Sequence, residues 1–150
     1  MPEHPQLIRI TAPEGEVIAG EWLSKAESVH RQLRPGLQPD YAAQMQRIFA
    51  GGAQMVVATD ASRVLGLAVW RIYPDTFSGL KFYVDDLVTD EACRSQGVGR
   101  ALIAWLGDEA RHSGANAIAL DSGTHRTNAH RFYFREGFII TSFNFKKQLS

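Results

Sequence analysis

The sequence predicts an α/β fold in which helices cover a single mixed sheet. Three observations support this class. Runs rich in β-branched and aromatic residues alternate with amphipathic stretches of helical period, the expected order of elements is β-α-α-β-β-β-α-β-α-β-β, and 45% of the 150 residues are hydrophobic. This length suits one domain with a substantial core, so residues 1–150 are expected to form a single domain.

The first half of the chain has clear helix boundaries. Pro35 and Pro39 disfavour helix in the residues before them and predict a loop. Asp40 can cap the next helix, which Gly51 and Gly52 end. In chain order, the expected elements are strand 7–11, helix 14–33, loop 34–39, helix 41–50, strands 54–58 and 64–73, turn 74–79, strand 82–89, a helix from Val98 to before Gly114, strand 115–121, helix 127–136 and closing strands within 138–148.

The stretch from Lys81 to Arg111 predicts an anion-binding junction of strand, glycine loop and helix. The first turn of a helix has backbone N–H groups without internal partners and carries partial positive charge. Gly97 and Gly99 have no Cβ that would keep a ligand from these groups, so a phosphate or pyrophosphate can lie against residues 95–101. Arg94 and Arg100 add full positive charges beside it.

Two common phosphate-binding motifs are excluded at this loop. A Walker A loop needs Gly-Lys followed by Ser or Thr, which follows neither glycine. A dinucleotide fingerprint would need a third glycine at the position of Leu102. The pattern that remains is Arg94-x-x-Gly97-x-Gly99.

Two motifs of this sequence resemble the GNAT superfamily of acetyl-CoA-dependent N-acetyltransferases. The Arg94–Gly99 pattern is similar to the family's loop between its fourth strand and third helix. The run Asn128–Phe138 is similar to its Ala-x-x-Phe-Tyr-x-x-x-Gly-Phe segment. The resemblance covers about residues 81–140, and the run Arg126–Phe145 most resembles aminoalkylphosphonate N-acetyltransferases. It implies a GNAT-like mixed central sheet of about six or seven strands flanked by four helices.

The resemblance implies acetyl-CoA as cosubstrate and a primary amine, of a small molecule, as acceptor. The family often has a cofactor-contacting asparagine seven residues before the tyrosine. That position is Arg126 here, and Asn128 lies two places further on, so the resemblance leaves open which of the two contacts the cofactor. The backbone of the strand end binds the cofactor's amide-rich arm. The full set of expected cofactor contacts is Leu87, Val88, Thr89, Arg94, Ser95, Gln96, Gly97, Val98, Gly99, Arg100, Ala101 and Asn128.

Three side chains are the candidates for catalysis. Asp85 or Asp86 would take the proton of the acceptor ammonium, whose deprotonation at pH 7 costs about 4–5 kcal/mol. Successive strand side chains point to opposite faces, so both acids can face the substrate only if a bulge intervenes. Tyr133, which the resemblance places by the cofactor sulfur, would protonate the leaving thiolate, although a core aromatic is the alternative.

Charge, hydropathy and residue types argue against nucleic-acid binding, a membrane span and a metal site. Sixteen basic and sixteen acidic residues give a formal net charge of zero, without the basic excess of nucleic-acid binders. No apolar run approaches the roughly 18 residues of a membrane span, the start lacks a secretory segment, and a cytoplasmic location is expected. His125 and His130 lack the partners of a metal site, so none is expected. A protein amine as acceptor, a non-catalytic acyl-CoA sensor and a homodimer formed through the apolar C-terminal strand stay open.

Overall fold

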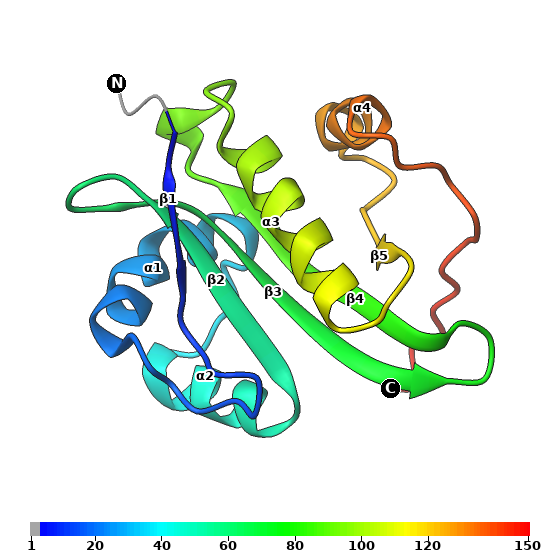
Figure 1. Cartoon of the computed structure of the whole chain (residues 1–150), viewed down its shortest axis with the longest axis horizontal. Coiled ribbons are helices and arrows are strands. Elements are labelled where there is room, and N and C mark those ends of the chain that lie inside the picture. The colour runs from blue at the N-terminus through cyan, green and yellow to red at the C-terminus, as the bar shows by residue number, and fades with distance from the viewer. Residues whose placement is uncertain (1–3) are drawn as a thin grey trace. The chain divides into compact units, whose positions relative to one another are not determined.

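A computed structural model of the protein describes residues 4–150, and Figure 1 traces their course. The described chain divides into two compact units, one ending at Ala119 and the other comprising Leu120–Ser150. The elements in order are β1 (Gln6–Arg9), α1 (Gly20–Leu33), α2 (Tyr41–Ala50), β2 (Ala53–Thr59), β3 (Val64–Asp75), β4 (Gly79–Thr89), a short 3-10 helix η1 (Glu91–Cys93), α3 (Val98–His112), β5 (Ile118–Leu120) and α4 (Thr127–Arg135).

One sheet with the strand order β1-β2-β3-β4-β5 forms the centre of the first unit. The pairs β1/β2, β2/β3 and β3/β4 are antiparallel. The chain passes from β4 to β5 through α3, the kind of crossover that parallel neighbours need. The mixed sheet and the four α-helices confirm the predicted class, but the sheet has five strands among the described residues instead of six or seven.

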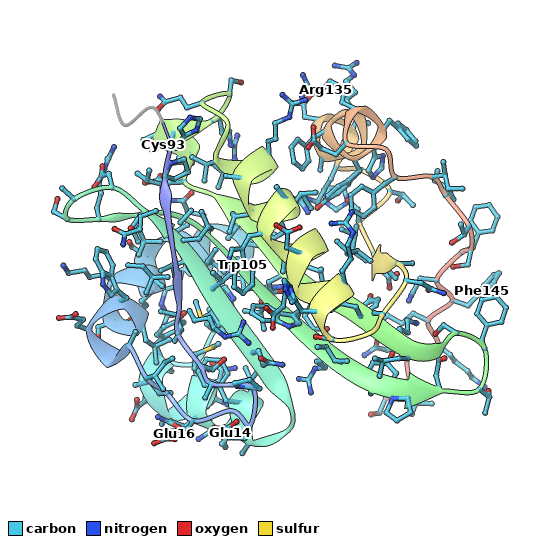
Figure 2. All side chains as sticks on the ribbon, viewed as in Figure 1. Glu14, Glu16, Cys93, Trp105, Arg135 and Phe145 are labelled. Carbon is cyan, nitrogen blue, oxygen red and sulfur yellow. The ribbon has the colours of Figure 1, made fainter. Side chains whose placement is uncertain are left out.

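Both faces of this sheet are covered by helices, α3 on one side and α1 with α2 on the other (Figure 1). Under α1 and α2, apolar side chains of β2 and β3 such as Val57, Leu67 and Val69 pack into one core. On the opposite face, Trp70 of β3 stacks on Phe82 and meets the edge of Trp105 from α3, which Figure 2 labels. All of β2 and the first seven residues of β3 are therefore buried, whereas β1, β4 and β5 are largely of intermediate exposure.

Several predicted boundaries differ from the structure. The strand predicted over 115–121 is shortened to β5, and β3 extends to Asp75, into the predicted turn. Two differences are larger. The first helix begins at Gly20 instead of residue 14, because residues 12–19 make a turn closed by a bridge between Thr11 and Val17. Gly15, with φ of +92°, allows that turn, and a Cβ there would lie 2.8 Å from the Phe49 carbonyl oxygen. At the other end, residues 138–148 form no strand in the described chain. The alternating aromatics there have strand character, but a strand also needs a neighbour that accepts its backbone hydrogen bonds.

Candidate active site

A β-bulge places Asp85 and Asp86 on the same face of the sheet. Val69 of β3 lies opposite Asp86, and the next residue, Trp70, lies opposite Val84, so Asp85 is the extra residue of β4. Val69 belongs to the core beneath α1 and α2. The partners of both carboxylates, described below, lie on this same side. The structure therefore meets the condition under which the two consecutive acids could act in one site.

Both carboxylate oxygens of Asp86 are occupied. Oδ2 lies 2.7 Å from Nε2 of His30, and Oδ1 accepts from the Arg34 guanidinium, with Nη2 at 2.6 Å. Burial by itself would raise the pKa of this carboxyl. The hydrogen bonds and charges of His30 and Arg34 outweigh burial and hold the pKa of Asp86 below its ordinary value. Asp86 is thus a firmly held anion.

Asp85 has more freedom than its neighbour. Its Oδ2 accepts from Nε of Arg71 on β3 at 2.8 Å, and its side chain is 31% exposed, against 13% for Asp86. Among the described residues, Oδ1 of Asp85 has no hydrogen-bond partner. Arg71 is itself fixed through Nη1 to the carbonyl oxygen of Gly51, 2.9 Å away. One oxygen of Asp85 is therefore anchored while the other stays available.

A buried histidine extends the acid pair into the helical layer. His30 lies in the last turn of α1 and is 1% exposed. Its Nδ1 is 2.8 Å from Oη of Tyr41, the first residue of α2, so one side chain connects Tyr41 to Asp86. Burial, with the negative charges of Glu27 and Asp86, raises the pKa of Tyr41, which keeps its hydroxyl neutral.

The sequence analysis gave His30 no functional role. The residue lies on the buried side of α1, within the range expected to be helical. A histidine inside an apolar stripe is itself a signal, because a buried polar ring needs hydrogen-bond partners. The identity of these partners depends on contacts 11 and 56 residues away in sequence.

The glycine loop contains two residues with left-handed backbone. Ser95 and Gly97 have φ of +64° and +82°. Ser95 is the non-glycine residue with positive φ in the described chain, a conformation that costs energy and often marks a functional turn. Left-handed residues occur in the turns whose successive N–H groups form anion-binding nests, and an anion site at this loop stays a prediction. Residues 94–97 are exposed, as a binding role requires.

The start of α3 follows the loop directly. Gly97 is the N-cap and Val98 the first helical residue. Val98 turns its side chain into the core, while Gly99 and Ala101 are partly exposed and Arg100 is exposed. The backbone N–H of Ala101 already donates to the carbonyl oxygen of Gly97 at 3.0 Å, so it is the least accessible donor of the predicted set. Gln96 and Gly97 are exposed and Val98 is buried, and the contact of these residues with a cofactor stays a prediction.

The last residues of β4 belong to the ladder with β3. Leu87, Val88 and Thr89 face Ala68, Leu67 and Gly66 of β3 on one side. On the other side of β4 lies β5, which has three residues against the eleven of β4. The contact of Leu87, Val88 and Thr89 with a cofactor stays a prediction.

The second unit carries the remaining predicted residues on α4. Tyr133 is partly buried, and Phe132 and Phe138 meet its ring at 5.5 Å in edge-on contacts. Burial raises the pKa of Tyr133, and Arg126 lowers it by less, so the phenol stays protonated at neutral pH. Asn128 lies in the first turn of α4, directly after the N-cap region at Arg126. Whether Asn128 or Arg126 binds a cofactor, and whether Tyr133 is catalytic, stay predictions.

Two classes of feature are absent from the described part of the chain. Residues 4–150 contain no group of three or more His, Cys, Asp or Glu side chains arranged to hold a metal ion. No helix within these residues is both long and apolar enough to cross a membrane.

Comparison with protein families gives one match that covers most of the chain. Residues 20–138 match the Acetyltransferase (GNAT) family. This range includes α1, the acid pair of β4, the glycine loop and the Tyr133 segment.

Curated relatives match over a shorter stretch. An uncharacterized N-acetyltransferase, YhdJ, of Bacillus subtilis is 43% identical over 70 residues, which is 46% of this chain and 49% of that protein. The aminoalkylphosphonate N-acetyltransferase of Salmonella typhimurium is 41% identical over 66 residues, 44% of this chain and 43% of that protein. The matched region thus spans less than half the length of either relative.

Solved structures share the whole fold at low sequence identity. The aminoglycoside N-acetyltransferase AAC(6')-Iy, in complex with a bisubstrate analogue of CoA, superimposes with a TM-score of 0.82 at 19% identity, covering 98% of this chain and 99% of that one. An acetyltransferase from Trypanosoma brucei gives 0.72 at 24% identity, with 96% and 100% covered. These likenesses establish the fold.

Proposed function

Because the chain belongs to the acetyltransferase (GNAT) family, we propose that it moves an acetyl group from acetyl-CoA to the primary amine of a small molecule. The amine attacks the thioester directly while both substrates are bound. The observation that carries this proposal is the bulge of β4, which brings two carboxylates to one face of the sheet. An acid at this place can accept the proton that an ammonium must lose before it attacks.

The cofactor is expected at the glycine loop. Its left-handed Ser95 and Gly97 and its exposed residues 94–97 fit a diphosphate, because unpaired N–H groups and the start of α3 attract negative charge there. Arg94, also exposed, adds a cationic side chain. The outer edge of β4 near Val88 can pair with an extended amide-containing arm as an added strand would.

The reaction is balanced by three proton transfers. A carboxylate of the acid pair takes one proton from the ammonium, and the neutral amine forms a C–N bond with the acetyl carbon. The C–S bond then breaks, and the thiolate takes the phenolic proton of Tyr133, which regains it from the nitrogen of the new amide. The products are the acetylated amine, coenzyme A and one released proton.

An aminoalkyl acid is the acceptor that we favour. The Salmonella relative is named for aminoalkylphosphonates. In this chain, two guanidinium groups lie at the acid pair, those of Arg34, which is half exposed, and Arg71. Arginine presents a planar set of donors that suits phosphonate and carboxylate oxygens. A molecule with an amine at one end and an anion at the other could therefore pair with both kinds of group at this site.

A thiol-release assay tests this function. Acetyl-CoA is offered with aminoalkylphosphonates, amino acids, aminoglycosides and peptides with a free N-terminus or lysine, and free coenzyme A is measured. Turnover with a small amine is expected. Turnover with peptides alone would indicate a protein acetyltransferase. Tyr133→Phe should lose turnover and still bind acetyl-CoA, whereas acetyl-CoA binding without turnover on any amine would indicate a sensor.

We also propose that two copies associate through the C-terminal segment, residues 139–149. Five large apolar side chains there are 70–91% exposed, namely Ile139, Ile140, Phe143, Phe145 and Leu149, and Figure 2 shows Phe145 projecting outward. An apolar segment without strand neighbours favours association. Light scattering should give twice the chain mass for the wild type and less for the double variant Phe143→Ser with Phe145→Ser. A wild-type monomer at all concentrations would contradict this assembly.

A further inference from the structure

The carboxylates of Asp85 and Asp86 differ in their hydrogen-bond and ion-pair partners. Asp86 gives one oxygen to His30 at 2.7 Å and the other to Arg34 at 2.6 Å. Asp85 gives one oxygen to Arg71, and its second oxygen has no partner among the described residues. A base needs an oxygen that can reach a proton on the substrate. Only Asp85 offers one without breaking an existing contact.

Asp86 is connected to both ends of the loop between α1 and α2. Arg34, the C-cap of α1, begins this loop and contacts Asp86 directly. Tyr41, the first residue after the loop, reaches Asp86 through the His30 ring. A second contact from Arg34, Nη2 to the carbonyl oxygen of Asp85 at 3.0 Å, ties the loop to the bulge itself.

Further hydrogen bonds hold the middle of the loop. Arg31 donates from Nη1 to the carbonyl oxygen of Leu37 and from Nη2 to that of Gln38, both at 2.7 Å. The Gln38 backbone N–H donates to the side chain of Gln44 at 2.7 Å. Residues 34–40 are therefore held in one conformation beside the acid pair, although two prolines and a glycine leave the segment without regular structure.

From this arrangement we infer that the neighbouring acids have different tasks. Asp85 takes the proton from the acceptor ammonium, and Asp86, held by His30 and Arg34, is a positioning residue that fixes the loop of residues 34–40 as a wall of the acceptor site. This inference rests on the proposed function. It assigns the base and names His30 and Tyr41 as the residues through which the loop is held.

The His30 ring links Tyr41 to Asp86 through both of its nitrogens. Its Nδ1 lies 2.8 Å from the Tyr41 hydroxyl oxygen, and its Nε2 pairs with the Asp86 carboxylate at 2.7 Å. In the base step, the ammonium N–H bond breaks, the proton moves to Oδ1 of Asp85 directly or through water, and the nitrogen keeps the electron pair with which it attacks. The charged and titratable groups around the two acids are Glu27, His30, Arg31, Arg34, Tyr41, Arg71 and Tyr83.

Steady-state kinetics of matched Asp→Asn variants tests this division. Asp85→Asn should lower kcat by about 10²–10⁴-fold at pH 7, the usual effect of removing a general base. This loss should shrink roughly tenfold per pH unit towards the pKa of the amine, because solution then supplies neutral amine. Asp86→Asn should raise KM for the amine by roughly tenfold and change kcat far less, at all pH values, which is the signature of lost binding. Asp108→Asn, an exposed acid of α3, is the control.

Variants of the histidine separate positioning from simple packing. His30→Gln keeps an amide N–H that can donate to Asp86, so its KM for the amine should stay close to the wild-type value. His30→Leu fills the space without a donor and should reproduce the raised KM of Asp86→Asn. Tyr41→Phe, which leaves Asp86 paired, provides a milder variant if His30→Leu does not fold. Equal KM values for His30→Gln and His30→Leu would contradict a positioning role.

Hydrogen exchange of the free protein tests the loop without any substrate. Backbone amides of residues 36–38 and 40 should exchange at least tenfold faster in Asp86→Asn than in the wild type, and at the wild-type rate in Asp85→Asn and Asp108→Asn. Unchanged exchange in Asp86→Asn would overturn the loop assignment. A pH-dependent loss of kcat in Asp86→Asn, with Asp85→Asn active, would overturn the base assignment. If the wild type acetylates no amine, the proposed function and the base fail together, and exchange still decides whether Asp86 holds the loop.

Discussion

Replacement of Gly66 by alanine should displace the start of α3 and with it the glycine loop. Gly66 lies on β3 opposite Thr89, where the helix approaches the sheet. A Cβ at this position would lie 2.8 Å from Cγ1 of Val98, 2.9 Å from the carbonyl oxygen of Val88 and 3.2 Å from Cδ1 of Leu102. Val98 is the first residue of α3, so the clash acts directly on the N-terminus that is proposed to bind the diphosphate.

The expected cost follows from which atoms can move. Carbon and oxygen atoms rarely approach a Cβ this closely, and the Val88 oxygen is backbone of the central sheet, which cannot shift without its ladder. Overpacking of this kind costs typically about 1–3 kcal/mol. For a protein of this size, each 1 kcal/mol lowers Tm by roughly 2–4 °C. A shift of α3 that relieves about 1.4 kcal/mol of strain must be reversed when the cofactor binds. Coenzyme A should then bind about tenfold more weakly.

Thermal unfolding and calorimetric titration with coenzyme A measure both effects. Gly107→Ala is the matched control. Gly107 lies on α3, and a Cβ at this position would meet only Nη1 of Arg111, at 3.6 Å. Alanine in a helix interior is favoured over glycine by roughly 0.5–1 kcal/mol, so this variant should be more stable and bind coenzyme A normally. An unchanged Tm and Kd for Gly66→Ala would refute the argument that a close β3–α3 approach sets the loop.

Three further predictions concern the loop and the titrating groups. Gly97→Ala should destabilise the fold by about 1–2 kcal/mol and weaken coenzyme A binding, because the left-handed φ of +82° disfavours a Cβ even without a steric clash; thermal unfolding and titration measure this. Burial raises the pKa of Tyr133, so the alkaline limb of the wild-type kcat–pH profile should lie above about pH 10. Burial raises the pKa of Asp86, but His30 and Arg34 lower it further than burial raises it; the carboxylate therefore stabilises the fold above about pH 4, and that contribution is lost as pH falls. Urea unfolding should show Asp86→Asn less stable than wild type at pH 7, with the difference shrinking as the pH falls below about 4.

Local chemistry was enough to predict most elements of the first unit. The Asp40 side chain accepts from the Ala43 backbone N–H at 3.0 Å, and α2 has the predicted bounds Tyr41–Ala50. The helix of the central stretch begins at Val98, and Gly114 adopts the left-handed conformation, φ +88°, that follows a helix end. Caps, glycines and apolar periodicity act within a few residues, which is why a sequence reveals them.

The wrong predictions concern segments whose structure depends on contacts with residues far away in the sequence. Phe143, Asn144 and Phe145 alternate aromatic and polar side chains as a strand does, yet backbone pairing depends on a neighbour that local sequence does not specify. The early start predicted for α1 failed for a related reason. The bridge between Thr11 and Val17 and the close approach of Gly15 to Phe49 are set by packing of α2, 34 positions along the chain from Gly15.

The arrangement of Asp85 and Asp86 depends both on local sequence and on the pairing of two strands. That Asp85 and Asp86 are acids near the end of a strand is visible in the sequence, but a strand of regular pleat would turn them to opposite faces. Their common orientation depends on the register shift at Val69 and Trp70, which is a property of two strands together. A bulge leaves its extra residue without a cross-strand partner, and that residue here is Asp85, the acid with the unoccupied oxygen. The same irregularity that brings the carboxylates together therefore also makes them unequal, because the residue in register, Asp86, is the one that His30 and Arg34 hold.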